Sequence, residues 1–337
     1  MSTPTTERIS LKEAERLCID AAIAAGASAP AAESIARAAV AAEAEGQPTV
    51  GLKHFIDYLD ALEAGRIDGT ATPLISRPAP AVILSDAGGG TAHLGFDMAF
   101  EDLAAVAETF GVAIFSQKNA YTAGALGYFV GRLAQRGLVG LAATNGPALL
   151  AGSGTTKPVF STNPLAFAAP TEHGPSLLID QSSSATAYVN IRAAAERGEA
   201  IPDGWALGPD GQPTTDPQAA MRGALVAFGG ARGANIALMV EVLAAGLSGA
   251  NWSLDAPSFA EGGKSPGSGL FVLAIDPRLF SDGFARRTGR HLDKLSNQFG
   301  LHVPGEAKAR QQAKSDRDGV AVDTAVLARI RSQLSRT

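Results

Sequence analysis

Hydrophobic positions in the first 65 residues recur at the spacing of amphipathic helices. Ser10 can cap a helix over residues 11–26, and Ser28–Pro30 opens a second helix over residues 31–46. A third helix, ended by Gly65, places its apolar stripe at Phe55, Tyr58, Leu59 and Leu62. The tyrosine of this stripe is expected to pack against its neighbours rather than to react. The pattern therefore predicts a helical N-terminal region.

From residue 81 the pattern changes to short β-rich runs that alternate with helical stretches. The β-rich runs are 81–87, 112–117, 138–145, 176–184 and 270–276, and the helical stretches are 96–110, 124–137 and 234–250. Residues 196–217 are rich in turn formers and predict a long loop, and a charged helical tail closes the chain. Such alternation predicts an α/β sheet.

The usual fingerprint of a dinucleotide-binding domain is missing from this α/β region. That fingerprint is G-x-G-x-x-G after a strand, with an acidic residue about 20 positions later. The nearest cluster, Gly88–Gly90, has the wrong spacing and no partner acid, so it is interpreted as a turn. A dinucleotide, if bound, is therefore expected to be held without a Rossmann domain.

Composition narrows the class of protein. With 337 residues, 46% of them hydrophobic, the chain can bury a sizeable core in more than one lobe. The 28 basic and 33 acidic residues give a net charge of −5 without a basic run, which argues against nucleic acid as the main partner. The single cysteine, Cys18, excludes an intrachain disulfide and is expected to be buried in the first helix.

Neither a targeting segment nor a metal site is visible. Residues 1–10 lack the apolar core of a signal peptide, and no stretch approaches the roughly 18 apolar residues that span a bilayer. A soluble cytoplasmic protein with no membrane partner is expected. The histidines are His54, His93, His173, His291 and His302, and their scatter predicts no catalytic metal.

The segment from Ala44 to Ile67 carries the most specific signal. It resembles G-x-x-S-H-G-x-x-R-x-x-x-Y-x-x-x-L-x-x-G-x-I of the type-2 malate/L-lactate dehydrogenase family, which includes reductases of cyclic imino acids. The matching positions are Gly46, Gly51, Tyr58, Leu62, Gly65 and Ile67. The family serine falls on Thr49, its histidine on Val50 and its arginine on His54.

Further blocks that resemble the family follow in the same order along the chain. They are NAYTAGALGY at 119–128, STNPLAF at 161–167, DQSSS at 180–184, IPDGWA at 201–206, TTDP at 214–217, GGARG at 229–233 and PGE at 304–306. A second histidine that some members use is Thr122 here. Each block is weak alone, but their shared order over most of the chain makes the resemblance strong.

The resemblance implies a non-Rossmann, mixed-sheet nicotinamide-binding domain with a helical N-terminal region, and a homodimer. Residues 1–80 would form the helical region with the substrate-site segment, 81–115 plus 286–337 a substrate and dimerisation lobe, and 116–285 the cofactor domain. NADPH or NADH would contact Tyr121, Thr122, Ala123, Gly124, Ala125, Leu178, Ile179, Asp180, Arg232, Gly233, Pro304 and Gly305. Glycines let backbone N–H groups approach phosphates, and arginine adds a fixed charge with bidentate geometry.

The resemblance also implies a proton relay that this chain has lost. Imino-acid reductases of the family carry a Ser-His-Asp relay, and its positions are Thr49, Val50 and Asn190 here. Valine neither donates nor accepts a proton. An aspartate that orients an imidazole has no role once the imidazole is gone, so the three changes are interpreted as coordinated.

Other side chains could replace the lost functions. Lys53 or His54 could supply the proton from one turn further along the helix, and Thr49 still offers a hydroxyl. His54 could instead anchor the substrate carboxylate, without the fork of an arginine. Lys118 is either a second carboxylate anchor or a surface charge, and Thr162 is the third candidate for substrate contact. Asn190 is either part of the site or a loop amide bonded to backbone.

These considerations favour hydride transfer from NAD(P)H to C2 of a small 2-imino or 2-oxo carboxylate. Ketone reduction leaves an alkoxide and gains about 10² to 10⁴ in rate from a general acid, whereas a cyclic imine can arrive already protonated. Cyclic imino acids such as Δ1-piperideine-2-carboxylate and Δ1-pyrroline-2-carboxylate are therefore the favoured substrates. A malate, lactate or sulfolactate type dehydrogenase and an inactive cofactor-binding homologue are the alternatives.

Overall fold

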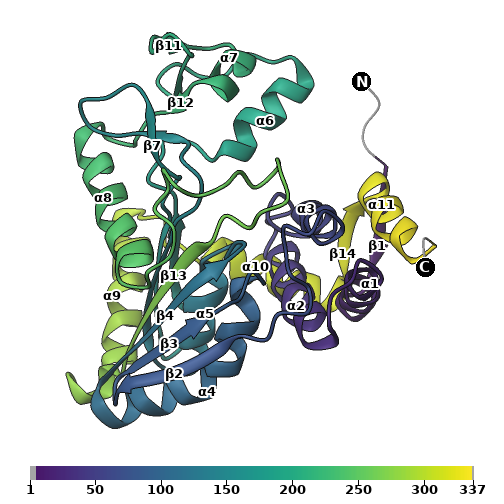
Figure 1. The fold of residues 1–337 in the computed structure, drawn as a ribbon. Helices are drawn as coiled ribbons and strands as arrows, with labels where there is room; N and C mark the ends of the chain where they lie inside the picture. Colours follow the sequence, from purple (N-terminus) through teal and green to yellow (C-terminus); the bar gives the residue numbers. More distant parts are fainter. Residues whose placement is uncertain (1–4, 336–337) are drawn as a thin grey trace.

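The apolar stripes of the first three predicted helices meet in a helical lobe, seen at the right of Figure 1. The structure is a computed structural model that describes residues 5–335. The lobe contains α1 (Leu11–Ala24), α2 (Ala29–Ala44), α3 (Leu52–Glu63) and α11 (Thr324–Leu334). Ser10 caps α1 as predicted, because its Oγ accepts a hydrogen bond from the Glu13 N–H at 3.1 Å. Tyr58 is 3% exposed, which confirms that it packs in the core.

The two ends of the described chain pair with each other beside this lobe. Strand β1 (Thr6–Ile9) runs antiparallel to β14 (Val320–Asp323), with Ile9 opposite Val320. Helix α11 follows β14 directly and packs against α1 and α3. The helical lobe is thus built from both ends of the sequence.

A seven-stranded sheet forms the body of the molecule. Its order is β2 (Leu74–Ala79), β3 (Val82–Asp86), β4 (Val112–Ala120), β13 (Ser268–Ile275), β5 (Val139–Thr144), β8 (Leu165–Ala169) and β9 (Leu177–Gln181). Strands β3 and β4 pair in parallel and the other neighbours pair antiparallel. This mixed sheet confirms the predicted non-Rossmann α/β class.

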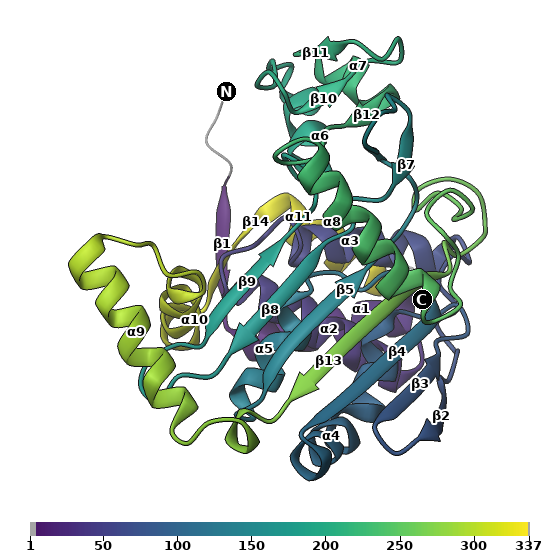
Figure 2. The ribbon, with the colours of Figure 1, turned by 90° about the vertical axis from the view of Figure 1, so that its left-hand side faces the viewer.

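Helices cover both faces of this sheet, as Figures 1 and 2 show from two sides. Helices α4 (Ala92–Phe110) and α5 (Gly127–Gln135) cover one face, where Phe96, Phe115 and Phe129 are fully buried. Helix α8 (Ala231–Glu241) continues into a π-helical turn, η1 (Val242–Gly246), on the other face.

The domain boundary expected between residues 115 and 116 falls inside β4. That strand pairs with β3 on one side and with β13 on the other, so the sheet runs continuously across the boundary.

A smaller lobe lies at the top of both views. Its five-stranded sheet has the order β11 (Pro213–Thr214), β10 (Ala206–Leu207), β12 (Ala224–Leu225), β6 (Leu150–Ala151) and β7 (Pro158–Phe160). Helices α6 (Tyr188–Arg197) and α7 (Pro217–Arg222) belong to it. No pattern predicted α6, because it buries only Ile191 and Ala194 and therefore carries a weak apolar stripe. Two short strands interrupt the long loop expected over 196–217.

The charged tail is helical, as expected. It comprises a 3₁₀ turn, η2 (Pro277–Leu279), followed by α9 (Phe284–Phe299) and α10 (Glu306–Asp318). Cys18 is buried and free, as predicted. No helix within residues 5–335 has both the length and the apolar character to cross a bilayer. Residues 1–10 were expected not to be a signal peptide. Residues 1–4 of that segment lie outside the described range.

Candidate functional site

The turn before α3 is fixed by a buried carboxylate. Glu43 is 7% exposed, and its Oε2 accepts a hydrogen bond from the Leu52 N–H at 2.9 Å, where Gly51 offers no side-chain cap. Burial raises the pKa of Glu43, although this hydrogen bond opposes the rise. A Cβ at Gly51 would lie 2.5 Å from the same oxygen, so only glycine fits there. Glu43 thereby sets the position at which α3 begins.

Thr49 and Val50, two of the positions that the resemblance assigns to a proton relay, lie on this turn. Thr49 is exposed, and Val50 is half-buried with its N–H donated to the Gln47 carbonyl at 3.1 Å. The turn is therefore held by backbone contacts, and neither side chain replaces an imidazole.

His54 forms a pair with an aspartate one turn further along α3. Its Nδ1 lies 2.8 Å from Asp57 Oδ2, and the edge of its ring packs on Tyr58 with centroids 4.7 Å apart. The His54 side chain is 25% exposed. Burial would raise the pKa of Asp57, but the hydrogen bond to His54 and the nearby Arg192 charge outweigh it and lower that pKa. Asp57 is thus held as a carboxylate beside an imidazole.

Helix α6 reaches α3 through charged side chains. Arg192 Nη2 lies 3.7 Å from Asp57 Oδ2, and Glu196 Oε2 lies 3.7 Å from Lys53 Nζ. Asn190 does not take part, because its Nδ2 donates to Thr186 Oγ1 at 3.0 Å and its side chain is exposed. The structure therefore brings Lys53 and His54 to the α3–α6 junction and leaves Asn190 to a local contact.

The loop from Tyr121 to Ala125 packs against the other side of this junction. Gly124 has φ +62°, and a Cβ there would lie 2.9 Å from the Tyr58 hydroxyl. Its N–H donates to Thr122 Oγ1 at 3.3 Å, while the Tyr121 hydroxyl donates to the Phe259 carbonyl at 2.9 Å. The predicted cofactor loop and the predicted substrate helix are therefore in contact.

His93, at the start of α4, is a residue that the sequence analysis passed over. It is 1% exposed, stacks on Phe129 with centroids 5.5 Å apart and contacts the edge of Tyr58. Burial lowers its pKa to about 4, although Asp97 opposes the fall, so the ring is neutral at pH 7. Its Nδ1 has no hydrogen-bond partner within the described residues. Nothing in the sequence around this single histidine predicted that it would be buried beside Tyr58.

The segments Leu178–Asp180 and Pro304–Gly305, both predicted to contact a cofactor, are adjacent. The Leu178 N–H donates to the Pro304 carbonyl at 3.1 Å. Gly305 has φ +98°, and a Cβ there would lie 2.8 Å from the Ser176 carbonyl oxygen. Ile179 and Asp180 continue the same strand, half-buried.

Asp180 belongs to a buried charge cluster that sequence reasoning missed. Its Oδ2 accepts from the Gly127 N–H at the start of α5 at 2.8 Å. Lys308 on α10 lies 3.6 Å from Glu45 Oε2 and faces Asp180 as well. Burial raises the pKa of both Asp180 and Glu45, and Lys308 opposes the rise at each. We name Glu45, Asp180 and Lys308 the carboxylate–lysine cluster.

The start of α8 presents open backbone and a cation. Gly229 and Gly230 have φ +58° and +64°, and a Cβ on either would have no atom within 4 Å. Gly230 provides no side-chain cap, and Arg232 is exposed and makes no ion pair within the described residues. Gly233 is buried, and a Cβ there would overlap the Phe228 carbonyl oxygen. A free helix N-terminus beside an unpaired arginine fits a phosphate group.

Thr162 and its neighbour Asn163 join the small lobe to the sheet. The Thr162 carbonyl accepts from the Ser183 N–H at 2.8 Å. Asn163 has φ +36° and is fully buried, and its Nδ2 donates to Glu241 Oε2 at 2.7 Å. Glu241 also accepts from the Ser253 N–H at 2.6 Å and from its hydroxyl at 2.8 Å. This block therefore has a structural role whatever Thr162 binds.

Lys118 lies on β4 and pairs with Asp86. Its Nζ is 3.6 Å from Asp86 Oδ2, and its side chain is 42% exposed. Asn119, in the left-handed region at φ +58°, donates to the other oxygen of Asp86 at 2.9 Å. Lys118 is thus occupied in a surface ion pair.

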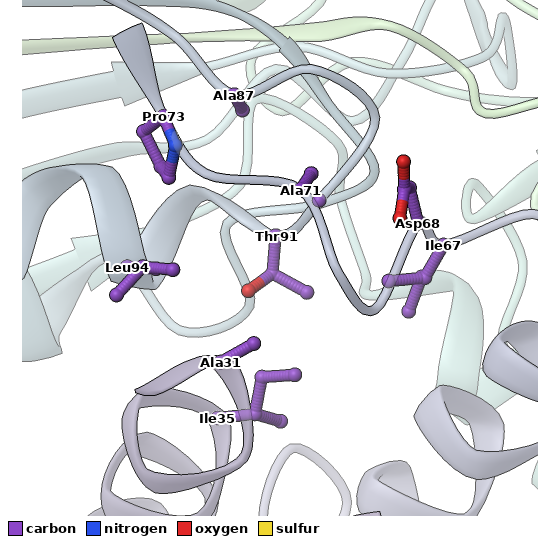
Figure 3. A pocket seen from close by; sticks show the side chains of 10 residues that line it. Ala31, Ile35, Ile67, Asp68, Ala71, Pro73, Ala87, Thr91 and Leu94 are labelled. Carbon is purple, nitrogen blue, oxygen red and sulfur yellow. The ribbon is translucent and has the colours of Figure 1, made fainter. Parts of the chain in front are cut away.

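Two cavities among the described residues lie away from the α3–α6 junction. Figure 3 shows one of about 10 Å³, lined by α2 residues such as Ile35, the Ile67–Pro73 segment and the start of α4 at Thr91 and Leu94. This volume holds about one water molecule. A groove of about 230 Å³ lies outside the Gly46–Pro48 turn, between α10 and β14. No cluster of histidine, cysteine and carboxylate side chains within residues 5–335 could hold a metal ion.

Comparison with known proteins connects this geometry to a family. A sequence model described as malate/L-lactate dehydrogenase matches residues 9–331. The chain is 38% identical to a (2R)-3-sulfolactate dehydrogenase (NADP(+)) of Chromohalobacter salexigens, covering 88% of this chain and 89% of that protein. It is 35% identical to a Δ(1)-pyrroline-2-carboxylate reductase of Ancylobacter novellus, covering 96% and 97%.

A solved structure agrees with both the fold and the sequence similarity. The crystal structure of Δ1-piperideine-2-carboxylate reductase from Pseudomonas syringae pv. tomato superposes with a TM-score of 0.93 at 31% identity. The superposition covers 97% of this chain and 100% of that one.

Proposed function

The chain belongs to the malate/L-lactate dehydrogenase family, and from this premise we propose that it is an NAD(P)H-dependent reductase of cyclic 2-imino carboxylates. The favoured substrates are Δ1-pyrroline-2-carboxylate and Δ1-piperideine-2-carboxylate, which appear in the names of several relatives. The product would be the corresponding cyclic amino acid.

The substitution of the relay positions is the observation that carries this proposal. Thr49, Val50 and Asn190 leave no imidazole at the family position. A cyclic imine that arrives as the iminium ion already holds the proton that a ketone would need from the enzyme. Loss of the relay therefore costs an imine reductase less than a 2-hydroxy-acid dehydrogenase.

The reduced nicotinamide supplies the hydride, and residues from four segments are proposed to hold the cofactor. Backbone N–H groups at the start of α8, with Arg232, suit a phosphate of the dinucleotide. The rest of the cofactor would contact Tyr121, Thr122, Ala123, Gly124 and Ala125, together with Leu178–Asp180 and Pro304–Gly305. Either NADPH or NADH fits this description.

On the substrate side, the α3–α6 junction is proposed to receive the carboxylate and the ring. Lys53 and His54 lie on α3 beside this junction, and Thr49 offers a hydroxyl in the turn before the same helix. Thr162 is a further contact candidate, whereas the ion pair of Lys118 with Asp86 makes it the weaker anchor. We further propose a homodimer in the cytoplasm, with residues 1–80 as the substrate-side lobe.

Reductase activity is the direct test of this proposal. Oxidation of NADPH and of NADH is followed at 340 nm with Δ1-piperideine-2-carboxylate, Δ1-pyrroline-2-carboxylate, pyruvate, oxaloacetate and 3-sulfopyruvate. We expect kcat/KM for a cyclic imine to exceed that for every 2-oxo acid by at least about tenfold, since a ketone depends more on a proton from the enzyme than an imine does. Reaction with 2-oxo acids alone would refute the proposal.

A sulfolactate-type dehydrogenase is the second candidate, because the relative of that name is 38% identical. It predicts that 3-sulfopyruvate is the best substrate of the panel. Binding of NADPH without turnover of any substrate would instead identify a homologue that binds cofactor and does not catalyse.

Replacement of Arg232 tests the proposed phosphate site independently of turnover. Arg232→Ala is expected to raise the Kd for NADPH about tenfold, because one charge-assisted contact contributes roughly 1.5 kcal/mol. The measurement is a titration of NADPH fluorescence with the free protein. Arg222→Ala, at an exposed arginine on α7, is the matched control and should leave Kd unchanged. An unchanged Kd for Arg232→Ala would place the phosphates elsewhere.

A further inference from the structure

The imidazole of His54 is held in one orientation by two other residues of α3. Asp57 occupies Nδ1 at 2.8 Å, and the Tyr58 ring packs against the imidazole at a centroid distance of 4.7 Å. Within residues 5–335, Nε2 has no hydrogen-bond partner. A carboxylate on Nδ1 selects one tautomer, which leaves Nε2 as the nitrogen available to another molecule.

The surroundings of the pair come from three elements and hold Asp57 as the carboxylate. Arg192 of α6 lies 3.7 Å from Asp57 and helps to lower the pKa of that carboxyl group. Glu196 of the same helix faces Lys53 at 3.7 Å. From α4, the buried ring of His93 contacts Tyr58 on the side away from solvent.

The pair also lies beside the loop that the proposed function assigns to the cofactor. Tyr58 contacts His54 through its ring, and its hydroxyl faces Gly124, where a Cβ would be 2.9 Å away. The same tyrosine therefore connects His54 to the Tyr121–Ala125 loop. A His–Asp pair on a solvent-facing helix surface would not contact a second element in this way.

We propose that His54 and Asp57 form a replacement proton-donating dyad, one helical turn beyond the emptied family position Val50. His54 is the catalytic residue, which protonates the substrate from Nε2. Asp57 is a positioning residue, which fixes the tautomer and stabilises the imidazolium. The inference rests on the proposed function, because it names the proton source for the same substrate.

Atoms and electrons balance in the proposed step. The C=N π bond is lost as C2 gains a hydride from the reduced nicotinamide and the imine nitrogen gains a proton from His54 Nε2. His54 changes from imidazolium to neutral imidazole, and solvent restores its proton. An imine that arrives protonated bypasses the donor, so the contribution of the dyad should be smallest at low pH, where most of the imine already carries its own proton.

Kinetics of two substitutions test the dyad. With the better cyclic imine at pH 8, His54→Gln is expected to lower kcat about 100-fold and Asp57→Asn about tenfold. KM should change less than about threefold in both. At pH 5.5, where more of the substrate carries its own proton, the loss in His54→Gln should shrink to below about tenfold.

Asp20→Asn is the matched control, since Asp20 forms an exposed pair with Arg16 on α1 and its replacement removes the same charge. Its kcat should equal that of the wild type at both pH values. Unchanged kcat in His54→Gln at pH 8 overturns the inference. A rise in KM with unchanged kcat also overturns it, because His54 would then anchor the carboxylate. If the wild type reduces no imine or oxo acid, it is the proposed function that fails.

A spectroscopic measurement gives a readout that does not depend on turnover. In ¹⁵N-histidine spectra of the free protein at pH 8, the neutral fraction of His54 should be the Nδ1–H tautomer, whose Nε2 takes a proton from solvent to form the donating imidazolium. The tautomer should shift towards Nε2–H in Asp57→Asn and remain unchanged in Asp20→Asn. An Nε2–H tautomer in the wild type would refute the role of Asp57, even if both variants lose activity.

Discussion

Glu241→Ala is expected to lower the free energy of unfolding by about 4 kcal/mol. The carboxylate is 4% exposed and accepts three hydrogen bonds, from Asn163 Nδ2 and from the N–H and hydroxyl of Ser253. Hydrogen bonds to charged groups contribute about 1.5 to 3 kcal/mol each, and a buried donor left without a partner costs about 1 to 3 kcal/mol. Desolvation of the carboxylate offsets part of this sum. Urea unfolding followed by circular dichroism measures the loss.

Two further variants define the cause of that loss. Glu241→Gln keeps the shape and one acceptor oxygen, so about half of the destabilisation is expected. Glu33→Ala, at an exposed glutamate of α2, should change stability by less than about 0.5 kcal/mol. If Glu241→Ala is as stable as Glu33→Ala, the network does not hold the small lobe on the sheet.

Lys308→Met is expected to destabilise the fold by about 3 kcal/mol at pH 7. Lys308 faces two buried carboxyl groups, Glu45 at 3.6 Å and Asp180. Removing one partner of a buried ionic cluster leaves uncompensated charge, which typically costs about 3 to 5 kcal/mol. The lower end applies, because the Lys308 and Glu45 side chains are 21% and 27% exposed.

Acidification should reverse part of this loss. Burial already raises the pKa of Asp180 and Glu45 above the values of the unfolded chain, and removal of Lys308 raises both pKa values further. The folded protein then binds more protons than the unfolded chain between the two sets of pKa values, so its stability increases as pH falls. The deficit of Lys308→Met should therefore shrink steadily from pH 7 towards about pH 4.5, near the unfolded pKa of glutamate.

Urea unfolding at pH 7, 6 and 5 measures this dependence. Lys314→Met, at an exposed lysine on the same helix, is the control and should show a small deficit that does not vary with pH. If the deficit of Lys308→Met grows on acidification, this would contradict the explanation that the Glu45 and Asp180 carboxylates repel each other once Lys308 is removed.

Local signals predicted much of the fold. Ser10, Pro30 and Gly65 mark helix ends that a side chain, a fixed φ or a left-handed residue determines, and these effects depend only on neighbouring residues. The absence of a Gly-rich fingerprint correctly excluded a Rossmann domain. Helix α6 was missed because its contacts with α3 are ion pairs, such as Arg192 with Asp57, which leave no apolar period.

The candidate site was predicted only in part, since motifs assign residues to a site without giving their partners. The sequence pointed to His54 and Asp180, but Asp57 and Lys308 gave no signal of their own. The interaction of Lys308 with Glu45 joins positions more than 260 residues apart, and no local pattern encodes such a contact. The placement of Asn190 on a helix face that does not meet α3 likewise depends on the packing of α6.

Pairing of β1 with β14 has a consequence for synthesis of the chain in the cell. Helix α3, which carries His54, packs in a lobe that is finished only by α11, at residues 324–334. A ribosome must therefore release those residues before the lobe around His54 can close. Nascent chains shorter than this would lack the helix that packs against both α1 and α3.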